Sequence, residues 1–78
     1  MVAHRTLDVK GTLCPVPVIQ AKLAIDAMDS GQILQVLATD PGSQKDIPAW
    51  AKRTGHQLLH TVTSEPGVFA FYVKKGGS

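Results

Sequence analysis

The hydrophobic and polar positions of the chain divide it into six segments separated by turn-forming residues. Residues 4–9 alternate apolar and polar positions around Leu7 and Val9, which predicts a first strand. Residues 17–29 have helical spacing instead, so that apolar and charged side chains fall on opposite sides of a helical wheel. The core-facing positions are Ala21, Ala24, Ile25 and Met28, and the polar positions are Lys22, Asp26 and Asp29. The Ser-Gly pair at 30–31 is a typical helix end.

A second strand and a second helix follow. Residues 32–39 are apolar at both odd and even positions, as expected of an inner strand of a sheet. The Asp-Pro-Gly-Ser run at 40–43 predicts a turn, and Ser43 and Asp46 have the spacing of a capping box at the start of a helix. The expected end of this helix is Gly55. Its predicted buried face consists of Ile47, Trp50, Ala51 and Thr54.

The remaining residues predict a hairpin, which completes the fold class. Residues 56–64 and 68–75 are expected strands joined by a Glu-Pro-Gly turn. The order is βαβαββ, and right-handed crossovers place both helices on one face of the sheet. We therefore predict an α/β two-layer sandwich, formed by a single domain over residues 1–78. Its core spans residues 4–75, residues 76–78 form a flexible tail, and the second sheet face is open to solvent or to a partner.

Composition and charge argue against several classes of protein. No apolar run approaches the roughly 20 residues that span a bilayer, so no membrane association is expected. The N-terminus lacks the apolar core of a signal peptide, and this together with a single cysteine favours a reducing, cytoplasmic location. The net charge of +2 comes from dispersed basic residues, so direct binding of nucleic acid is not expected.

The single cysteine, Cys14, is the most informative residue of the chain. It lies in the run Leu-Cys-Pro-Val-Pro, between the first strand and the first helix. A proline disfavours helical backbone in the residue before it, so we expect extended backbone at Cys14 and Val16. Pro17 suits the first position of a helix. Pro15 and Pro17 would therefore hold the thiol on a stiff, exposed loop, where the helix dipole moderately favours the thiolate.

These motifs together resemble the TusA/SirA family of small sulfur-carrier proteins, and the similarity extends over about residues 7–75. The resemblance implies a mixed four-stranded sheet in the order 1-2-4-3, with the last strand antiparallel. It rests on Leu7-Asp8 and Gly11, on Cys-Pro-x-Pro at 14–17, on Ala-Thr-Asp-Pro-Gly-Ser at 38–43, on Asp-Ile-Pro at 46–48, and on Lys-Lys-Gly at 74–76.

The resemblance assigns a persulfide to Cys14, which would be the catalytic residue of a sulfurtransferase. A lone cysteine suits this role, because a neighbouring thiol would discharge the persulfide into a disulfide. Asp40 and Lys22 correspond to family residues that lie near the cysteine and help to meet partners. Each also has a simpler interpretation, Asp40 as a turn former and Lys22 as the ion-pair partner of Asp26. Val16 stands where many members have glutamate, and an apolar residue there is common in carriers of sulfur-oxidising bacteria.

The implied function is that of a monomeric carrier that accepts sulfur on Cys14 from a cysteine desulfurase or a rhodanese-like protein. The sulfur would pass to an acceptor protein in tRNA 2-thiolation or in dissimilatory sulfur oxidation, and supply to molybdenum-cofactor assembly is also compatible. No cofactor is expected beyond the covalent persulfide. The residues do not choose among these acceptors.

Other kinds of site fit the residues less well. A zinc site would need three or four ligands, and a Cys-His hydrolase would need an oriented base beside the thiol and a substrate cleft. The only candidate zinc ligands are Cys14, His4, His56 and His60. The Gly-Gly pair at 76–77 is followed by Ser78, so it is not the terminus of a thiocarboxylate carrier. No metal is therefore expected.

The alternative from a different class is a regulatory module without catalysis. Such a module would bind a protein partner through the open sheet face or through the surface around Trp50. It would not need a nucleophilic sulfur. Trp50 shares a helical face with Ile47 and Ala51, however, which favours a position in the core.

Overall fold

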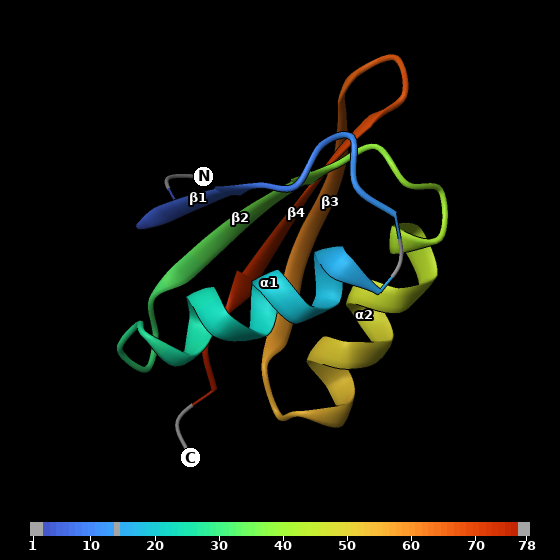
Figure 1. Cartoon of the computed structure of the whole chain (residues 1–78). Coiled ribbons are helices and arrows are strands. Elements are labelled where there is room, and N and C mark those ends of the chain that lie inside the picture. The colour runs from blue at the N-terminus through green and yellow to red at the C-terminus, as the bar shows by residue number, and fades with distance from the viewer. Residues whose placement is uncertain (1–2, 14, 77–78) are drawn as a thin grey trace.

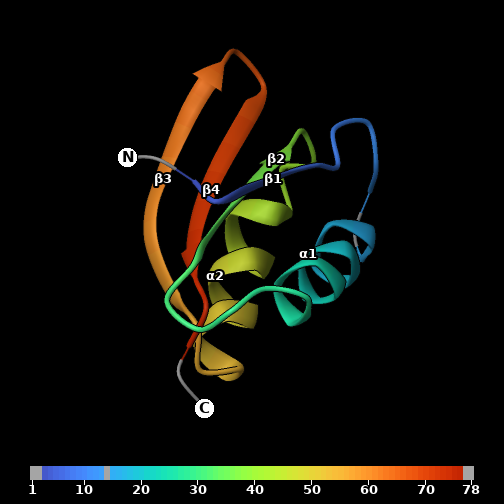
Figure 2. The ribbon, with the colours of Figure 1, turned by 90° about the vertical axis from the view of Figure 1, so that its left-hand side faces the viewer.

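Four strands and two helices alternate in the predicted order in the computed structural model, which describes residues 3–13 and 15–76. The elements are β1 (Arg5–Asp8), α1 (Val16–Asp26), β2 (Ile33–Ala38), α2 (Ser43–Arg53), β3 (Gln57–Glu65) and β4 (Val68–Lys74) (Figure 1). The sheet order β1-β2-β4-β3 confirms the order implied by the resemblance. β1 and β2 are parallel, whereas β4 is antiparallel to both of its neighbours. Both helices cover one face of the sheet, which confirms the two-layer sandwich (Figure 2).

The core lies between the two helices and one face of the two central strands. Side chains of β2 alternate, with Leu34, Val36 and Ala38 fully buried and the residues between them partly exposed. Phe71 and Val73 of β4 are fully buried beside them. The two helices complete this core with the buried residues Ala21, Ala24, Ile25, Ile47, Trp50 and Ala51, and Met28 follows α1. The helical wheel therefore predicted the inner face of α1 correctly, whereas Thr54 of the second helix is exposed.

The ends of α1 differ from the prediction at both sides. Val16 is the first helical residue, so our expectation of extended backbone there was wrong. Its N–H donates to the carbonyl of Leu13, and Pro17 is fully buried. The gain from packing therefore outweighs the ordinary bias against helical backbone before a proline. The helix ends at Asp26 and not at 29, and Lys75, the residue after β4, donates from its Nζ to the carbonyl oxygens of Asp26 and Met28 at this end.

The start of α2 also differs from the prediction. Gly42 precedes the helix, and no side chain caps it in the expected Ser43–Asp46 pattern. Asp40 forms the turn instead: its Oδ1 accepts from the Gly42 N–H at 3.1 Å, and its carbonyl accepts from the Ser43 N–H at 3.0 Å. The Ser43 hydroxyl is buried and has no partner among the described residues. The capping-box prediction was therefore wrong, because an earlier carboxylate already occupies the turn.

The strand hairpin and the chain end are both held by specific contacts. The turn at Pro66-Gly67 has a positive φ of 80° at its glycine, as a tight hairpin turn after proline requires. Near the C-terminus, Gly76 donates its N–H to Nδ1 of His56 at 2.9 Å. A side chain at 76 would collide with the carbonyl oxygen of Gly55. Gly76, which we expected in the tail, is thus held against the end of α2, and residues 77–78 lie outside the described residues.

A row of polar side chains crosses the sheet face that carries no helix. Thr6 Oγ1 donates to Gln35 Oε1, and Gln35 Nε2 donates to the Tyr72 hydroxyl at 2.9 Å. Tyr72 lies beside His60 of β3, with ring centroids 6.4 Å apart. These residues are in register on four adjacent strands. The free face of the sheet is thus organised by polar contacts between its own side chains.

Replacing Ser43 with alanine tests how α2 begins. If Ser43 capped the helix, the substitution would lower the free energy of unfolding by about 0.5–2 kcal/mol. Because its hydroxyl is buried without a partner, we expect Ser43→Ala to be neutral or stabilising by up to about 1 kcal/mol. Urea unfolding of Ser43→Ala beside Gln44→Ala, an exposed control in the same turn, measures this. A loss of more than about 0.5 kcal/mol would restore the capping role.

The His56–Gly76 contact predicts a pH-dependent stability. Burial lowers the pKa of His56, with Asp26 opposing the shift and Lys75 reinforcing it, so the folded state favours the neutral imidazole that accepts the Gly76 N–H. The unfolded state then binds more protons, and the contribution is complete above about pH 6.5 and lost as the pH falls through the lowered value. We expect the free energy of unfolding to decrease from about pH 7.5 to about pH 5. The substitution His56→Gln should remove this dependence on pH. His60→Gln is the matched control, and an unchanged slope in His56→Gln would contradict the assignment.

Candidate functional site

The cysteine loop and the Asp-Pro turn lie side by side at one edge of the sheet. The first loop follows β1 and the second follows β2, and because these strands are parallel their carboxyl ends meet at the same edge. The Gly11 N–H donates to Oγ1 of Thr39 at 2.9 Å, which joins the two loops directly. Cys14 itself lies outside the described residues, but the residues on both sides of it are described.

Short-range hydrogen bonds hold the segment that precedes the cysteine. Val9 is buried, and its N–H donates to the Leu37 carbonyl at 2.9 Å. Thr12 folds back onto Val9, since both its hydroxyl and its N–H donate to the Val9 carbonyl. Gly11 makes the reversal possible with a φ of +81°. The loop is therefore anchored to β1 and β2 before it reaches the surface at Leu13.

The first turn of α1 holds the other side of the motif. Pro15 precedes the helix and is exposed, whereas Pro17 is fully buried. Neither proline has an N–H, and the N–H of Val16 already donates to Leu13. Few backbone N–H groups at the start of this helix can therefore donate to an anion. The helix dipole remains, so the expected preference for the thiolate is moderate, as the two prolines suggested.

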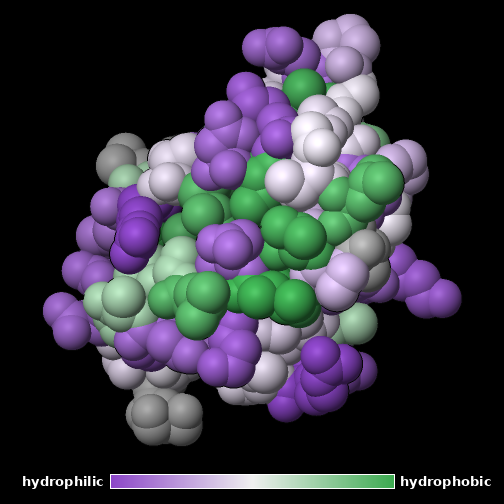
Figure 3. Space-filling model, in the orientation of Figure 1, coloured by the Kyte–Doolittle hydropathy of each residue, from purple (hydrophilic) through white to green (hydrophobic). Residues whose placement is uncertain are grey.

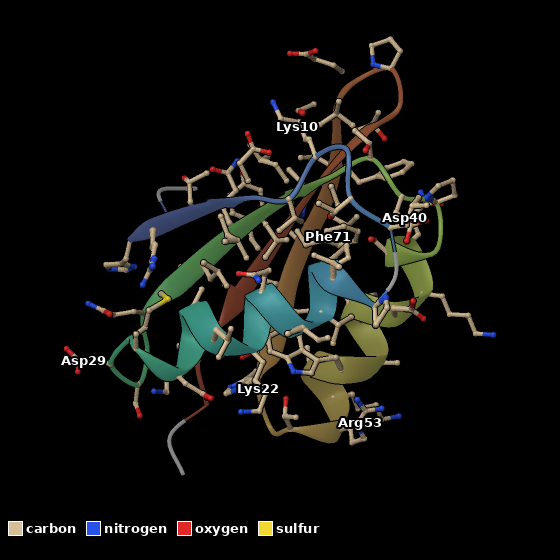
Figure 4. All side chains as sticks on the ribbon, in the orientation of Figure 1. Lys10, Lys22, Asp29, Asp40, Arg53 and Phe71 are labelled. Atoms are coloured by element: carbon tan, nitrogen blue, oxygen red, sulfur yellow. The ribbon has the colours of Figure 1, made fainter. Side chains whose placement is uncertain are left out.

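Asp40 is a buried carboxylate at the start of α2, and α1 begins at the same end of the molecule (Figure 4). Its Oδ1 accepts from the Gly42 N–H, so the side chain shapes the turn. The Asp46 carboxylate lies near the same glycine. A Cβ atom placed on Gly42 would be 3.4 Å from Asp40 Oδ2 and 3.6 Å from Asp46 Oδ2. Two acidic groups therefore gather at the turn next to the cysteine loop.

Lys22 lies on the surface of α1 and is engaged in an ion pair. Its Nζ is 2.8 Å from Oδ2 of Asp26, one helical turn further on. This hydrogen bond lowers the pKa of Asp26 below its usual value. Both side chains are more than half exposed, so the pair does not remove Lys22 from contact with a partner protein. The structure thus supports the simpler interpretation of Lys22 as the ion-pair partner of Asp26.

An apolar strip on the outside of α1 was missed by the sequence analysis. All the large hydrophobic side chains that are exposed among the described residues lie on it, and they are visible as a green band in Figure 3. The strip consists of Leu13, Val16, Ile19 and Leu23. The spacing 16, 19 and 23 is helical and could have revealed it. We assigned one apolar face to this helix, and the structure shows two.

The described residues hold neither a metal cluster nor a pocket. No group of three or more His, Cys, Asp or Glu side chains among them is arranged to hold a metal ion, and no cavity was found between them. His4 accepts from the Ile33 N–H, the His56 ring lies tilted beside Trp50, and His60 lies beside Tyr72 on the sheet. Neither described helix is long and apolar enough to cross a bilayer.

Comparison with known proteins agrees with this arrangement. A sulfur carrier protein TusA from Allochromatium vinosum is 51% identical over 69 residues, which cover 88% of this chain and 90% of that protein. The "Putative sulfur carrier protein YrkI" of Bacillus subtilis is 43% identical over 76 residues, covering 97% of this chain and 100% of that protein. A crystal structure of a SirA-like protein from Desulfitobacterium hafniense superposes with a TM-score of 0.81 at 29% identity, covering 92% of this chain and 97% of that one.

The similarity is not confined to the cysteine motif. The family described as sulfurtransferase TusA matches residues 5–75, from the first residue of β1 to the residue after β4. That range contains the cysteine loop, the Asp-Pro turn and both helices. The chain therefore belongs to the TusA family of sulfur carriers.

Proposed function

We propose that Cys14 carries the sulfur as a persulfide and passes it between two partner proteins. The observation that supports this most directly is that Cys14 is the chain's single cysteine. A sulfur carrier needs one reactive sulfur, and no other residue type in the chain performs this exchange at neutral pH. The residues on either side of it, Leu13 and Pro15, are both exposed. An exposed segment is what an exchange between two proteins requires.

The proposed transfer is an exchange between sulfur atoms without net oxidation. The Cys14 thiolate attacks the outer sulfur of a donor persulfide. The sulfur–sulfur bond of the donor breaks, and the donor cysteine leaves as a thiolate. Cys14 then bears the persulfide, whose outer sulfur is attacked by the acceptor in the same way. Because the chain has no second cysteine, the persulfide has no internal route to a disulfide.

For the two partners we propose classes of protein. The donor is a cysteine desulfurase or a rhodanese-like protein, since both present a persulfide on a cysteine. The acceptor belongs to a tRNA 2-thiolation relay or to a sulfur-oxidation complex. The relative from Allochromatium vinosum, 51% identical, supports a carrier of this kind. A reducing compartment such as the cytoplasm would keep the lone thiol available.

The regulatory module that binds through the open sheet face receives less support. The helix-free face carries the Thr6–Gln35–Tyr72 row, in which each polar group already has a partner on the sheet. Trp50 is buried, so the surface around it does not present its ring. The large exposed apolar side chains of the described residues are on the opposite layer. We therefore prefer the carrier.

Removing the sulfur of Cys14 should abolish loading. We expect intact-mass spectrometry of the wild type after incubation with polysulfide to show an increase of about 32 Da, which a reductant removes. Cys14→Ser should show none while keeping the same thermal unfolding midpoint within about 2 °C. A wild type that does not load under conditions that load another sulfur carrier would contradict the persulfide. So would an equal mass increase in Cys14→Ser.

Neutralising Asp40 separates partner contact from the chemistry of the sulfur. Asp40→Asn keeps an oxygen that accepts from the Gly42 N–H but removes the charge. We expect loading from polysulfide to stay within about twofold, and transfer from a protein donor to slow by several-fold, because the negatively charged turn that Asp40 forms lies beside the cysteine loop that the donor must approach. Asp40→Ala, which also loses the hydrogen bond, should in addition unfold more easily by about 1 kcal/mol. If Asp40→Asn instead impairs polysulfide loading, Asp40 acts on the sulfur itself.

A further inference from the structure

The exposed apolar strip on α1 is not required by the fold. Leu13 is 71% exposed, Val16 38%, Ile19 50% and Leu23 58%. At about 100° per residue, positions 16, 19 and 23 lie within roughly 60° of one another around the helix. The opposite side of the same helix carries the buried residues Ala21, Ala24 and Ile25. α1 is thus apolar on an inner face that packs on the sheet and on an outer face that meets water.

The strip is continuous with the proposed site. Leu13 directly precedes Cys14, and Val16 follows it by two residues. From there the strip extends along α1 to Leu23, forming one band across the face seen in Figure 3. Any protein surface that covers this band therefore also covers the residues that flank the cysteine. Grouped apolar side chains on a monomeric surface usually mark a binding site, unlike single exposed ones.

Basic side chains border the strip. Lys10 lies on one side of α1 in Figure 4, and Lys22 and Arg53 lie on the other. The ion pairs found among the described residues engage Lys10 with Asp8 and Lys22 with Asp26, and both pairs are exposed. Lys52 precedes Arg53 in the last turn of α2 and is also exposed. Lys10 and Lys22 are each paired with a carboxylate, and Asp40 and Asp46 lie at the turn next to the cysteine loop. The basic border of the strip is therefore the end of α2 that carries Lys52 and Arg53, and it favours a partner with acidic groups beside an apolar centre.

We propose that the strip is the docking surface for the protein with which the chain exchanges sulfur, a partner presenting an apolar recess with carboxylates at its rim. This rests on the proposed function, because it concerns the partner of the same site. Burying Leu13, Ile19 and Leu23 provides the attraction, and the basic border orients the encounter. Because Leu13 and Val16 flank the cysteine in the sequence, a partner docked on the strip meets the segment that carries it.

A second copy of the chain fits the strip less well. A stable dimer buries about 800 Å² on each subunit. That is nearly a fifth of the 4473 Å² surface of this small chain, more than four side chains along one helix supply. A limited interface suits a carrier, which must release each partner after exchange.

The test compares loading by a small molecule with loading by a protein. The variants are Ile19→Glu and Leu23→Glu, which place a charge within the strip at exposed positions, and Leu23→Met, which keeps the strip apolar. Thr63→Glu adds the same charge at an exposed position on β3 and is the matched control. The small molecule is polysulfide. The protein donor is whichever of a cysteine desulfurase and a thiosulfate-charged rhodanese loads the wild type.

We expect both glutamate variants to load from polysulfide like the wild type but to accept sulfur from the protein donor at least about tenfold more slowly. Thr63→Glu should behave like the wild type in both assays, and Leu23→Met should keep most of the transfer from the protein donor that Leu23→Glu loses. Arg53→Glu should slow the protein reaction at low salt, and the difference should shrink as salt screens the border.

Three results separate the possible outcomes. Unchanged transfer from the protein donor in Ile19→Glu and Leu23→Glu would overturn the docking surface. A wild type that elutes as a dimer, and becomes monomeric in Leu23→Glu, would overturn it in favour of a second copy. A wild type that fails to load from polysulfide would reject the persulfide function itself, which is a different failure from the loss of docking.

Discussion

The parallel pairing of β1 with β2 is the constraint on which the rest of the structure depends. Parallel neighbours cannot be joined by a tight turn, so the chain must cross the sheet through α1 before β2 begins. The same pairing brings the loops after both strands to one edge, where Gly11 and Thr39 are hydrogen-bonded. Cys14 and Asp40 belong to these two loops. The site is therefore a consequence of strand direction.

The helix α1 serves the fold and the site with different faces. Its inner face uses the small residues Ala21 and Ala24, which allow the helix to lie close to the sheet. Its outer face places Ile19 and Leu23 in water beside the cysteine loop. The part of this apolar surface that stays in water does not contribute to folding, because it is hydrated in the folded and in the unfolded chain. A binding role explains its presence better than stability does.

Contacts outside the expected local patterns are found at the ends of both helices. α1 ends at Asp26, where Lys75 from the far end of the chain donates to the carbonyl oxygens of Asp26 and Met28. α2 begins without a Ser43 cap, and Asp40 occupies the turn before it. Local patterns such as a capping box or a Ser-Gly pair describe what a segment prefers in isolation. They do not include residues such as Lys75, which the fold brings to a helix end.

The sequence by itself determined the element order, the inner faces of the strands and helices, and a single cysteine directly before the Pro-Val-Pro run. These follow from local periodicity and from residue chemistry, which need no knowledge of neighbours in space. Only the tertiary structure decided that the outer face of α1 stays exposed and that the loop after β1 is hydrogen-bonded to the loop after β2, through Gly11 and Thr39. The spacing of apolar residues along a helix is the same whether they face a core or water. Their burial depends on which surfaces the chain brings against them, and here no part of the described chain covers the strip beside Cys14.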